Sequence, residues 1–184
     1  MFADRFKNAV EFVQAPLSFR PLGRSDFPLL EQWLSAPHVD AWWHERLDLA
    51  GVAEKFGPRV DGAEPTHVFV IEQDGRPIGW IQWYLWADYP AHALQLAAEP
   101  ASAGMDLAIG ELGMTGLGLG PAAIRAFLEQ IVFRNASVSA VIADPEEKNL
   151  RSLRAFQKAG FRVTKTVQLV GENFKRRVVR VGRR

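Results

Sequence analysis

The chain has 184 residues, of which 48% are hydrophobic and 23% are charged, and its formal net charge is +1. This length is sufficient for one domain with a sizeable core, and the composition is typical of a globular protein. The near-neutral charge gives no reason to expect nucleic acid or a membrane surface as a partner. The absence of cysteine excludes a disulfide framework, a thiolate nucleophile and a cysteine metal site.

The N-terminal residues carry scattered charges and contain no uninterrupted apolar segment, so they do not resemble a secretory signal. No stretch approaches the roughly 18 apolar residues of a membrane-spanning helix. We therefore expect a soluble, cytoplasmic protein, either monomeric or homodimeric. It would have a loose or helical extension over residues 1–16 and a single domain over residues 17–184.

Alternating residues predict a strand over residues 17–22. Residues 25–36 predict a helix that Pro37 ends, with Ser25 or Asp26 as its N-cap and apolar residues at helical spacing. The segment 38–57 predicts a loop or short turn and then a second helix, which stops near Gly57 and Pro58.

Residues 66–88 contain the clearest hairpin of the chain. Two β-branched and aromatic runs flank Asp74 and Gly75, a dipeptide that tolerates the positive φ angles of a tight turn. Residues 87–103 are predicted as a loop, because Pro90 and Pro100 interrupt them.

The second half of the chain alternates between strands and helices. Strands are predicted over residues 104–112 and 137–144, and a helix over residues 121–133 has Pro121 in its first turn. Another helix over residues 149–160 is closed by Gly160, and residues 161–181 form a final hairpin. This order predicts one mixed sheet with helices on both faces.

Three alternate glycines, Gly116, Gly118 and Gly120, stand immediately before the helix that starts near residue 121. No lysine follows them, which excludes a nucleoside-triphosphatase P-loop. Gly118-x-Gly120-x-x-Ala123, with Asp144 further on, matches a dinucleotide fingerprint, but the antiparallel hairpins on either side are foreign to a doubly wound sheet. The remaining interpretation is a loop whose successive N–H groups bind a pyrophosphate at a helix N-terminus. Its two leucines, Leu117 and Leu119, would anchor the loop in the core.

Two motifs carry a resemblance to a known family. Thr115-x-x-Gly118-x-Gly120 resembles the coenzyme A motif Q/R-x-x-G-x-G/A of the GCN5-related N-acetyltransferase (GNAT) superfamily. The segment NLRSLRAFQKAGF resembles the helix of that family which Asn opens and which ends in K-x-G-F. Residues 17–165 are similar to the aminoglycoside 6'-N-acetyltransferases and the related siderophore acyltransferases. The resemblance implies an α+β, GNAT-like fold, with a mixed, mostly antiparallel sheet of about seven strands and helices on both faces.

The resemblance also implies an activity, namely acetyl transfer from acetyl-CoA to a primary amine of a small molecule. Direct attack in a ternary complex is expected, since no cysteine is present to carry an acyl group. Asp106 would be the base, and the backbone N–H of Leu107 or Ala108 would polarise the carbonyl. Further coenzyme contacts are implied for Leu107–Ile109 (pantetheine) and for the N–H groups of Thr115, Gly116, Leu117, Gly118, Leu119 and Gly120 (pyrophosphate). Asn149 would contact the coenzyme, cap its helix, or do both, and no metal is expected.

The chain departs from the family pattern at Phe156, where the family's common general acid is a tyrosine. Phenylalanine has no proton to donate. Either the thiolate leaves unprotonated or through water, or another group serves, with Tyr84, Tyr89 and His92 as candidates. A non-catalytic acyl-CoA-binding module is the alternative from another class of function.

The acceptor site is predicted from charge and from the resemblance. A polycationic acceptor favours a cleft rich in carboxylates, with candidates Asp40, Glu45, Asp48, Asp88, Glu99 and Asp106. The resemblance implies that the site is lined by Trp42, Trp43, His44, Gln82 and Tyr84, although a structural role is typical for His38 and His44. Residues 88–100 are mostly apolar where the aminoglycoside enzymes are acidic, so siderophore or hydroxylysine-type amines and protein amines stay open.

The tryptophans and the basic C-terminal segment are two further features of the composition. Six tryptophans lie in the first half of the chain and favour core packing, an aromatic-walled pocket, or both. The basic C-terminal segment, residues 174–184, is interpreted as a strand with a solvated cationic face rather than as a nucleic-acid site.

Overall fold

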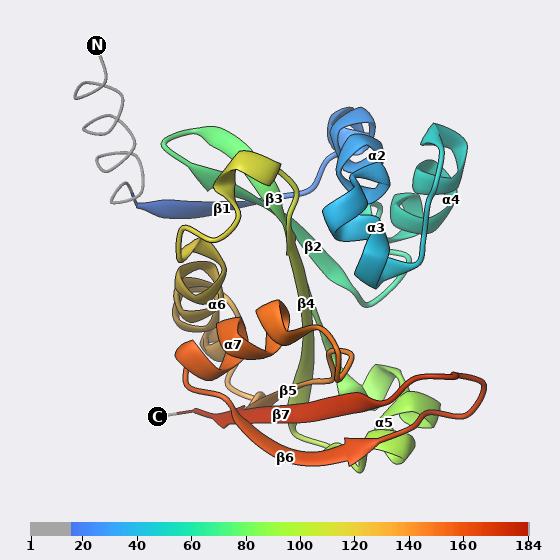
Figure 1. Ribbon diagram of the computed structural model, residues 1–184, viewed down its shortest axis with the longest axis vertical. Helices are drawn as coiled ribbons and strands as arrows, with labels where there is room; N and C mark the ends of the chain where they lie inside the picture. The colour runs from blue at the N-terminus through green and yellow to red at the C-terminus, as the bar shows by residue number, and fades with distance from the viewer. Residues whose placement is uncertain (1–15, 184) are drawn as a thin grey trace.

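The computed structural model describes residues 16–183, and its strands form one seven-stranded sheet (Figure 1). The strand order is β1-β2-β3-β4-β5-β7-β6. Neighbouring strands are antiparallel except β4 and β5, which are parallel. The predicted mixed and mostly antiparallel sheet is therefore confirmed. Of the predicted extension, residues 1–16, all but Pro16 lies outside the described residues.

The antiparallel half of the sheet contains β1 (Leu17–Pro21), β2 (His67–Gln73) and β3 (Arg76–Leu85). The predicted hairpin turn between β2 and β3 is confirmed, since Asp74 and Gly75 have φ angles of 50° and 70°. Positive φ at both central residues is the requirement of a type I′ turn, whose twist matches that of the flanking strands.

Three helices cover one face of this half: α2 (Phe27–Ser35), α3 (Pro37–Trp43) and α4 (Leu49–Val60) (Figure 1). A short 3-10 turn, η1 (Arg24–Asp26), precedes them. Their core contains Trp33 stacked on Trp80 of β3, with ring centroids 6.1 Å apart.

The local predictions for this helical region need three corrections. The segment expected to be a loop or short turn holds α3, and Pro37 begins that helix, because proline suits the first helical position. The next helix, α4, continues through Gly57 and Pro58 to Val60. Pro58 lies in its last turn and, having no backbone N–H, removes one hydrogen bond of the helix. Asp26 occupies the predicted N-cap position of α2, but its carboxylate does not cap that helix; it accepts the Gly23 N–H at 2.8 Å and caps the 3-10 turn η1 instead.

The opposite face of the sheet is covered by α6 (Leu119–Gln130) and α7 (Leu150–Lys158) (Figure 1). Pro121 lies in the first turn of α6 as predicted, but α6 ends before residue 133, and a 3-10 turn, η4 (Val132–Arg134), follows it. The predicted end of α7 is confirmed. Gly160 has a φ of 101°, and its N–H bonds to Gln157 while the next N–H bonds to Phe156, which is the Schellman pattern.

Strand β4 (Ser102–Ile109) begins and ends earlier than predicted, and a 3-10 turn, η3 (Leu112–Met114), follows it. Its parallel neighbour β5 (Ala140–Ala143) is shorter than predicted. The two strands pair only over residues 102–104 of β4. Residues 105–109 of β4 therefore have a paired strand on the β3 side alone, and a gap opens in the sheet beside them.

The predicted final hairpin is confirmed by β6 (Arg162–Val167) and β7 (Arg176–Gly182), with β7 next to β5. The predicted loop over residues 87–103 is wrong, because it contains the end of a 3-10 turn, η2 (Trp86–Asp88), and the helix α5 (Pro90–Leu96).

Helix α5 forms because its apolar residues reach the core. Leu96 and Trp86 are both 1% exposed and pack with Ile142 of β5 and Val178 of β7. Pro90 is the first residue of α5, so this proline starts a helix instead of breaking one. Within residues 16–183, no helix has both the length and the apolar character needed to cross a membrane.

Candidate active site

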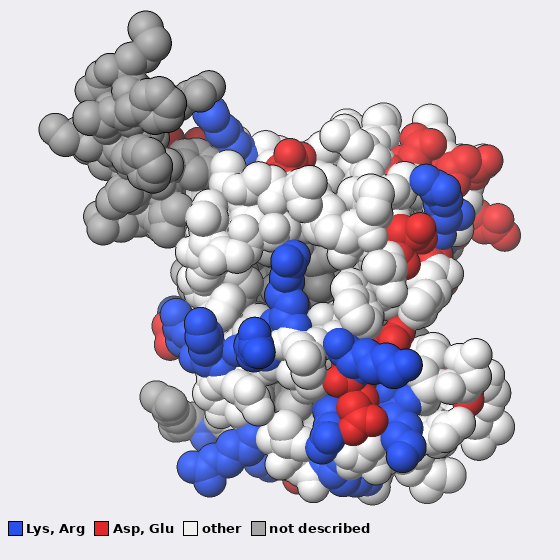
Figure 2. Space-filling model, in the orientation of Figure 1, with Lys and Arg blue, Asp and Glu red and all other residues white. Residues whose placement is uncertain are grey.

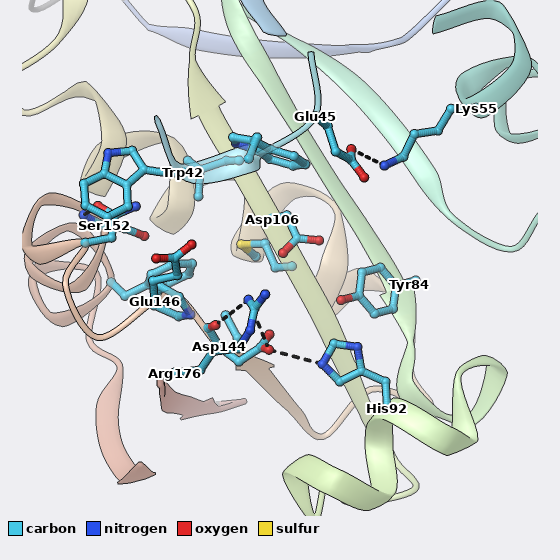
Figure 3. Close-up of a pocket in the computed structure, with 17 residues that line it drawn as sticks. Trp42, Glu45, Lys55, Tyr84, His92, Asp106, Asp144, Glu146, Ser152 and Arg176 are labelled. Carbon is cyan, nitrogen blue, oxygen red and sulfur yellow. Dashed lines mark hydrogen bonds and ion pairs between the residues drawn. The ribbon is translucent and has the colours of Figure 1, made fainter. Parts of the chain in front are cut away.

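Two cavities meet at the gap between β4 and β5. The polar cavity, of about 260 Å³, is lined by residues of helices α3, α4, α5 and α7, of strands β3, β4, β5 and β7, and of the loops after α3 and β5 (Figure 3). The glycine-loop groove, of about 410 Å³, runs along β4, the start of α6 and one side of α7. Five residues line both cavities: Trp42, Trp43, Leu107, Asn149 and Ser152.

The backbone of β4 presents Leu107 to this gap. The Gly110 N–H donates to a β3 carbonyl oxygen at 2.9 Å, whereas the Ile109 carbonyl oxygen contacts His38 Nε2 at 3.0 Å. Since backbone groups alternate in direction along an antiparallel strand, the N–H groups of Leu107 and Ile109 point away from β3 and that of Ala108 points towards it. Of the two amides predicted to polarise a carbonyl, only the Leu107 N–H faces the gap.

Asp106 lies in the wall of the polar cavity, opposite Gln82 of β3 in the register. Gln82 Nε2 donates to Asp106 Oδ2 at 2.9 Å, and Arg59 Nη1 donates to Gln82 Oε1, the oxygen of the same side-chain amide, at 3.2 Å. Burial raises the pKa of Asp106 above its ordinary value, the Gln82 bond opposes that rise, and the charge of Asp144 adds to it. A carboxyl group with a raised pKa in a cleft is a candidate general base.

Four carboxylates surround the polar cavity: Glu45, Asp106, Asp144 and Glu146 (Figure 3). The cations there are already paired, since Lys55 binds Glu45 and Arg176 forms two bonds to Glu172, at 2.6 and 2.7 Å.

Asp144 contacts two basic side chains in this cavity, those of Arg176 and His92. Its Oδ2 lies 3.6 Å from Arg176 Nη1 and 3.2 Å from His92 Nε2. The hydrogen bond to Asp144 raises the pKa of His92. A cavity with an excess of carboxylates attracts a cationic ligand.

Aromatic side chains form the remaining walls of the polar cavity: Trp42, Trp43, Tyr84 and Phe156. The Tyr84 ring lies directly over Gly104, because a Cβ at residue 104 would stand 2.2 Å from that ring. Burial raises the pKa of Tyr84 well above its usual value. The other tryptophans, Trp33, Trp80, Trp83 and Trp86, are buried in the core, so the six tryptophans divide between the two predicted roles.

The glycine loop forms one end of the groove. Gly116 and Gly118 have φ angles of 80° and 84°, a region that favours glycine. Gly120 has no positive φ, and a Cβ there would make only ordinary contact with Ala155 at 3.6 Å. The first turn of α6 follows at once, so its unpaired N–H groups are available to an anion.

Three cations of α7 line the same groove: Arg151, Arg154 and Lys158. Their side chains form no ion pair with any residue in 16–183. Figure 2 shows Lys and Arg side chains gathered over the region of α7, whereas acidic side chains gather over the region of α4.

The groove contains most of the residues predicted to bind a coenzyme: Leu107, Ala108, Ile109, Thr115, Gly116, Gly118, Gly120 and Asn149. The side chains of Leu117 and Leu119 line neither cavity. Leu119 is buried as expected, but Leu117 is 44% exposed and does not anchor the loop in the core. Asn149 caps α7, since its Oδ1 accepts the Ser152 N–H at 3.0 Å. It also lines both cavities, so the same residue lies within the groove predicted for the coenzyme.

The structure divides the residues predicted for the acceptor site. Trp42, Trp43, Tyr84 and Asp106 line the polar cavity. Gln82 lies behind Asp106, and His44 lies behind Glu146, with its Nε2 2.5 Å from the glutamate oxygen. His38 and His44 thus both make the hydrogen bonds of structural histidines.

Of the six candidate carboxylates, only Glu45 and Asp106 line the polar cavity; Asp40, Asp48, Asp88 and Glu99 do not. Asp48 caps α4 by accepting the Gly51 N–H at 2.8 Å, and Glu99 pairs with Arg180 at 3.0 Å. Among the candidates for the missing tyrosine, Tyr84 and His92 reach the cavity. Tyr89 does not line it, and its hydroxyl contacts Thr66 at 2.5 Å.

Sequence reasoning missed Asp144 and Glu146 as acceptor-site residues, along with Ser152 and Arg176. The two acids could have been found, because they directly follow a buried strand, and ligands commonly bind beyond the carboxyl ends of parallel strands. Arg176 carries no such signal, since it stands in a run of basic residues on the last strand.

Comparison with known proteins identifies the family. The family model described as an acetyltransferase (GNAT) domain matches residues 23–169. Aminoglycoside N(6')-acetyltransferase type 1 of Klebsiella pneumoniae is 30% identical over 154 residues, which cover 82% of this chain and 76% of that protein. The lysine N-acyltransferase MbtK of Mycolicibacterium paratuberculosis is 22% identical, over 83% of this chain and 68% of that protein.

Solved structures agree with this result. The crystal structure of aminoglycoside acetyltransferase AAC(6')-Ib in complex with coenzyme A superposes with a TM-score of 0.83 and 28% identity, covering 91% of this chain and 95% of that chain. Its complex with coenzyme A and kanamycin has a TM-score of 0.82. The chain therefore belongs to the GNAT family of acetyltransferases and is an acetyl-CoA-dependent N-acetyltransferase.

Proposed function

We propose that the protein acetylates a primary amine of a polycationic small molecule, with the 6'-amine of an aminoglycoside as the acceptor. The observation that carries this proposal is the set of four carboxylates around a cavity that joins the glycine-loop groove at Leu107. The relative from Klebsiella pneumoniae is named for that reaction, and the AAC(6')-Ib complex contains coenzyme A and kanamycin.

The glycine-loop groove fits acetyl-CoA, which supplies the acetyl group as an activated thioester. The N–H groups at the start of α6 and the positive-φ glycines suit a pyrophosphate. The cations of α7, which have no ion partner in the described chain, suit the remaining phosphate charge. The Leu107 N–H and the Asn149 side chain would hold the pantetheine end, where the two cavities meet.

Asp106 acts as the general base in this proposal. An amine acceptor enters as an ammonium, whose pKa is near that of lysine, about 10.4, so it must lose a proton before its nitrogen can attack. Asp106 accepts that proton, and Gln82 holds its carboxylate in place through the 2.9 Å bond. The Leu107 N–H donates to the carbonyl oxygen as negative charge develops there. Attack is direct, because the chain has no cysteine to form an acyl-enzyme.

The other carboxylates of the polar cavity, those of Glu45, Asp144 and Glu146, hold the remaining ammonium groups of the acceptor. The segment of residues 88–100 is apolar because α5 packs into the core. The acidic side chains of the cavity come from α3–α4, β4 and the loop after β5 instead, so that apolar segment is no objection to an aminoglycoside.

The experiment combines calorimetric titration with acetyl-CoA and thiol release across a panel of amines. We expect binding, and release with kanamycin and ribostamycin, and mass spectrometry of the product should place the acetyl group on the 6'-amine. Release with hydroxylysine or with peptide amines alone would replace the aminoglycoside by one of those acceptors. Binding without release for every amine would indicate a non-catalytic acyl-CoA-binding module.

A further inference from the structure

Ser152 lies where the two cavities meet. It is the third residue of α7 and precedes Phe156 by four residues, so the two side chains share one face of the helix. Ser152 lines both the polar cavity and the glycine-loop groove, next to Trp42 (Figure 3). The other candidates for the missing tyrosine, Tyr84 and His92, line the polar cavity and not the groove.

The Ser152 hydroxyl is free to donate a hydrogen bond. Its backbone N–H is bound by Asn149 Oδ1 at 3.0 Å, but its Oγ has no hydrogen-bond partner among residues 16–183. Serine hydroxyls within helices commonly bond back to a carbonyl of the preceding turn, and this one does not. Leu107, whose N–H faces the gap, lines the same junction.

We propose that Ser152 is a catalytic residue that donates a hydrogen bond to the sulfur of the leaving coenzyme A thiolate. It takes over, one helical turn earlier, the role that Phe156 cannot perform. This inference rests on the proposed function, because it requires acetyl-CoA in the glycine-loop groove with its thioester at the junction.

Acetyl transfer exchanges one bond of the carbonyl carbon for another. The amine nitrogen forms a bond to the carbonyl carbon, the C–S bond breaks, and its electron pair goes to sulfur. Ser152 stabilises that charge by a hydrogen bond and keeps its own proton, since a hydroxyl is a weaker acid than a thiol. Asp106 has already taken the proton of the ammonium before attack; the nitrogen loses a second proton to solvent as the amide forms, and the thiolate takes a proton from solvent. The products are the acetylated amine and free coenzyme A.

The first test compares wild type with Ser152→Ala in steady-state thiol release. A hydrogen bond to a charged group is worth enough that kcat should fall by about 10- to 100-fold, with little change in KM for acetyl-CoA. Ser35→Ala, at the end of α2 and away from both cavities, is the matched control and should leave kcat unchanged. Thermal unfolding of each variant verifies that it is folded.

The second test needs no acceptor. The ultraviolet absorbance of the thiolate of bound coenzyme A is titrated against pH in wild type, in Ser152→Ala and in Ser152→Ala/Phe156→Tyr. Loss of the donor should move thiolate formation to higher pH, because the hydrogen bond favours the charged form. The tyrosine of the double variant should return the midpoint towards that of wild type and raise kcat again.

An unchanged titration midpoint in Ser152→Ala would overturn the proposal, even if kcat falls, because the loss would then come from packing. If coenzyme A binds but no amine supports turnover, the acceptor assignment fails while the titration still decides the role of Ser152. If coenzyme A does not bind at all, the proposed function fails and the role of Ser152 falls with it.

Discussion

Replacing Gln82 tests whether Asp106 is the catalytic base. In Gln82→Leu the amide that donates to Asp106 Oδ2 at 2.9 Å is absent. A hydrogen bond to a charged group contributes about 1.5–3 kcal/mol, so the ionised form of Asp106 loses that much stabilisation relative to the protonated form. The pKa of Asp106, which burial already raises, should therefore rise further.

A higher pKa of Asp106 should lower the activity at acidic pH. A base works in its ionised form, so acetyl transfer increases as the pH rises through the pKa of Asp106. A higher pKa moves this acidic limb of the kcat/KM profile to higher pH. At a pH on the limb, kcat/KM of Gln82→Leu should be about 10- to 100-fold lower than that of wild type, since each 1.4 kcal/mol is tenfold. At a pH well above the limb, the difference should shrink.

A second substitution sharpens the assay. Gln82→Glu retains a side-chain acceptor for Arg59, which donates to Gln82 Oε1 at 3.2 Å. It also places a like charge against Asp106 and should shift the limb further. Gln130→Leu, at the exposed end of α6, is the control. The measurement is kcat/KM against pH for each variant, with thermal unfolding alongside. Limbs that coincide with the wild-type limb in both folded Gln82 variants would refute Asp106 as the ionisation that controls the rate.

Asp106→Asn should lower kcat by about 10²- to 10⁴-fold while calorimetry shows coenzyme binding retained. Because burial raises the pKa of Asp106, the folded protein loses stability as the pH rises through that pKa and the carboxyl ionises. The asparagine variant carries no such charge, so it should melt at a higher temperature at neutral pH; an equal or lower melting temperature would contradict this. The double variant Arg151→Ala/Arg154→Ala should raise KM for acetyl-CoA about 5- to 50-fold at low salt and less at high salt, and a salt-independent effect would exclude a charge contact. In Gly104→Ala the new Cβ would stand 2.2 Å from the Tyr84 ring, so displacement of that ring should destabilise the protein by about 1–3 kcal/mol in denaturant unfolding.

Several features of the fold could be predicted from the sequence because they depend on neighbours in the chain. Asp74 and Gly75 specify a tight turn through their tolerance of positive φ. Gly160 ends α7 for the same reason. The loop around Gly116 and Gly118 is recognisable because a chain needs glycine at such φ angles immediately before a helix.

Other elements could not be placed by local rules. Pro37 is predicted to end a helix and Pro90 to interrupt a loop, yet both begin a helix, because proline also suits the first helical position. Helix α5 forms because Leu96 is buried against residues of β5 and β7, and that burial depends on strands far away in the sequence. Short helices are marginal without such packing.

The sequence by itself determined the order of the strands, the two hairpins and the glycine loop, because turn residues, periodicity and motif spacing are properties of the chain. Asp106 was assigned from the resemblance of its strand to the family pattern. Tertiary structure alone decided which carboxylates share a cavity. Asp106 and Asp144 share the polar cavity because β4 and β5 are neighbouring strands. The two strands separate after residue 104 of β4, which opens the gap that Leu107 faces. Packing of the whole sheet sets which strands are in contact, so the sequence marks Asp144 only as an acid that follows a buried strand. Only the tertiary structure places Asp144 and Ser152 in the same cavity as Asp106.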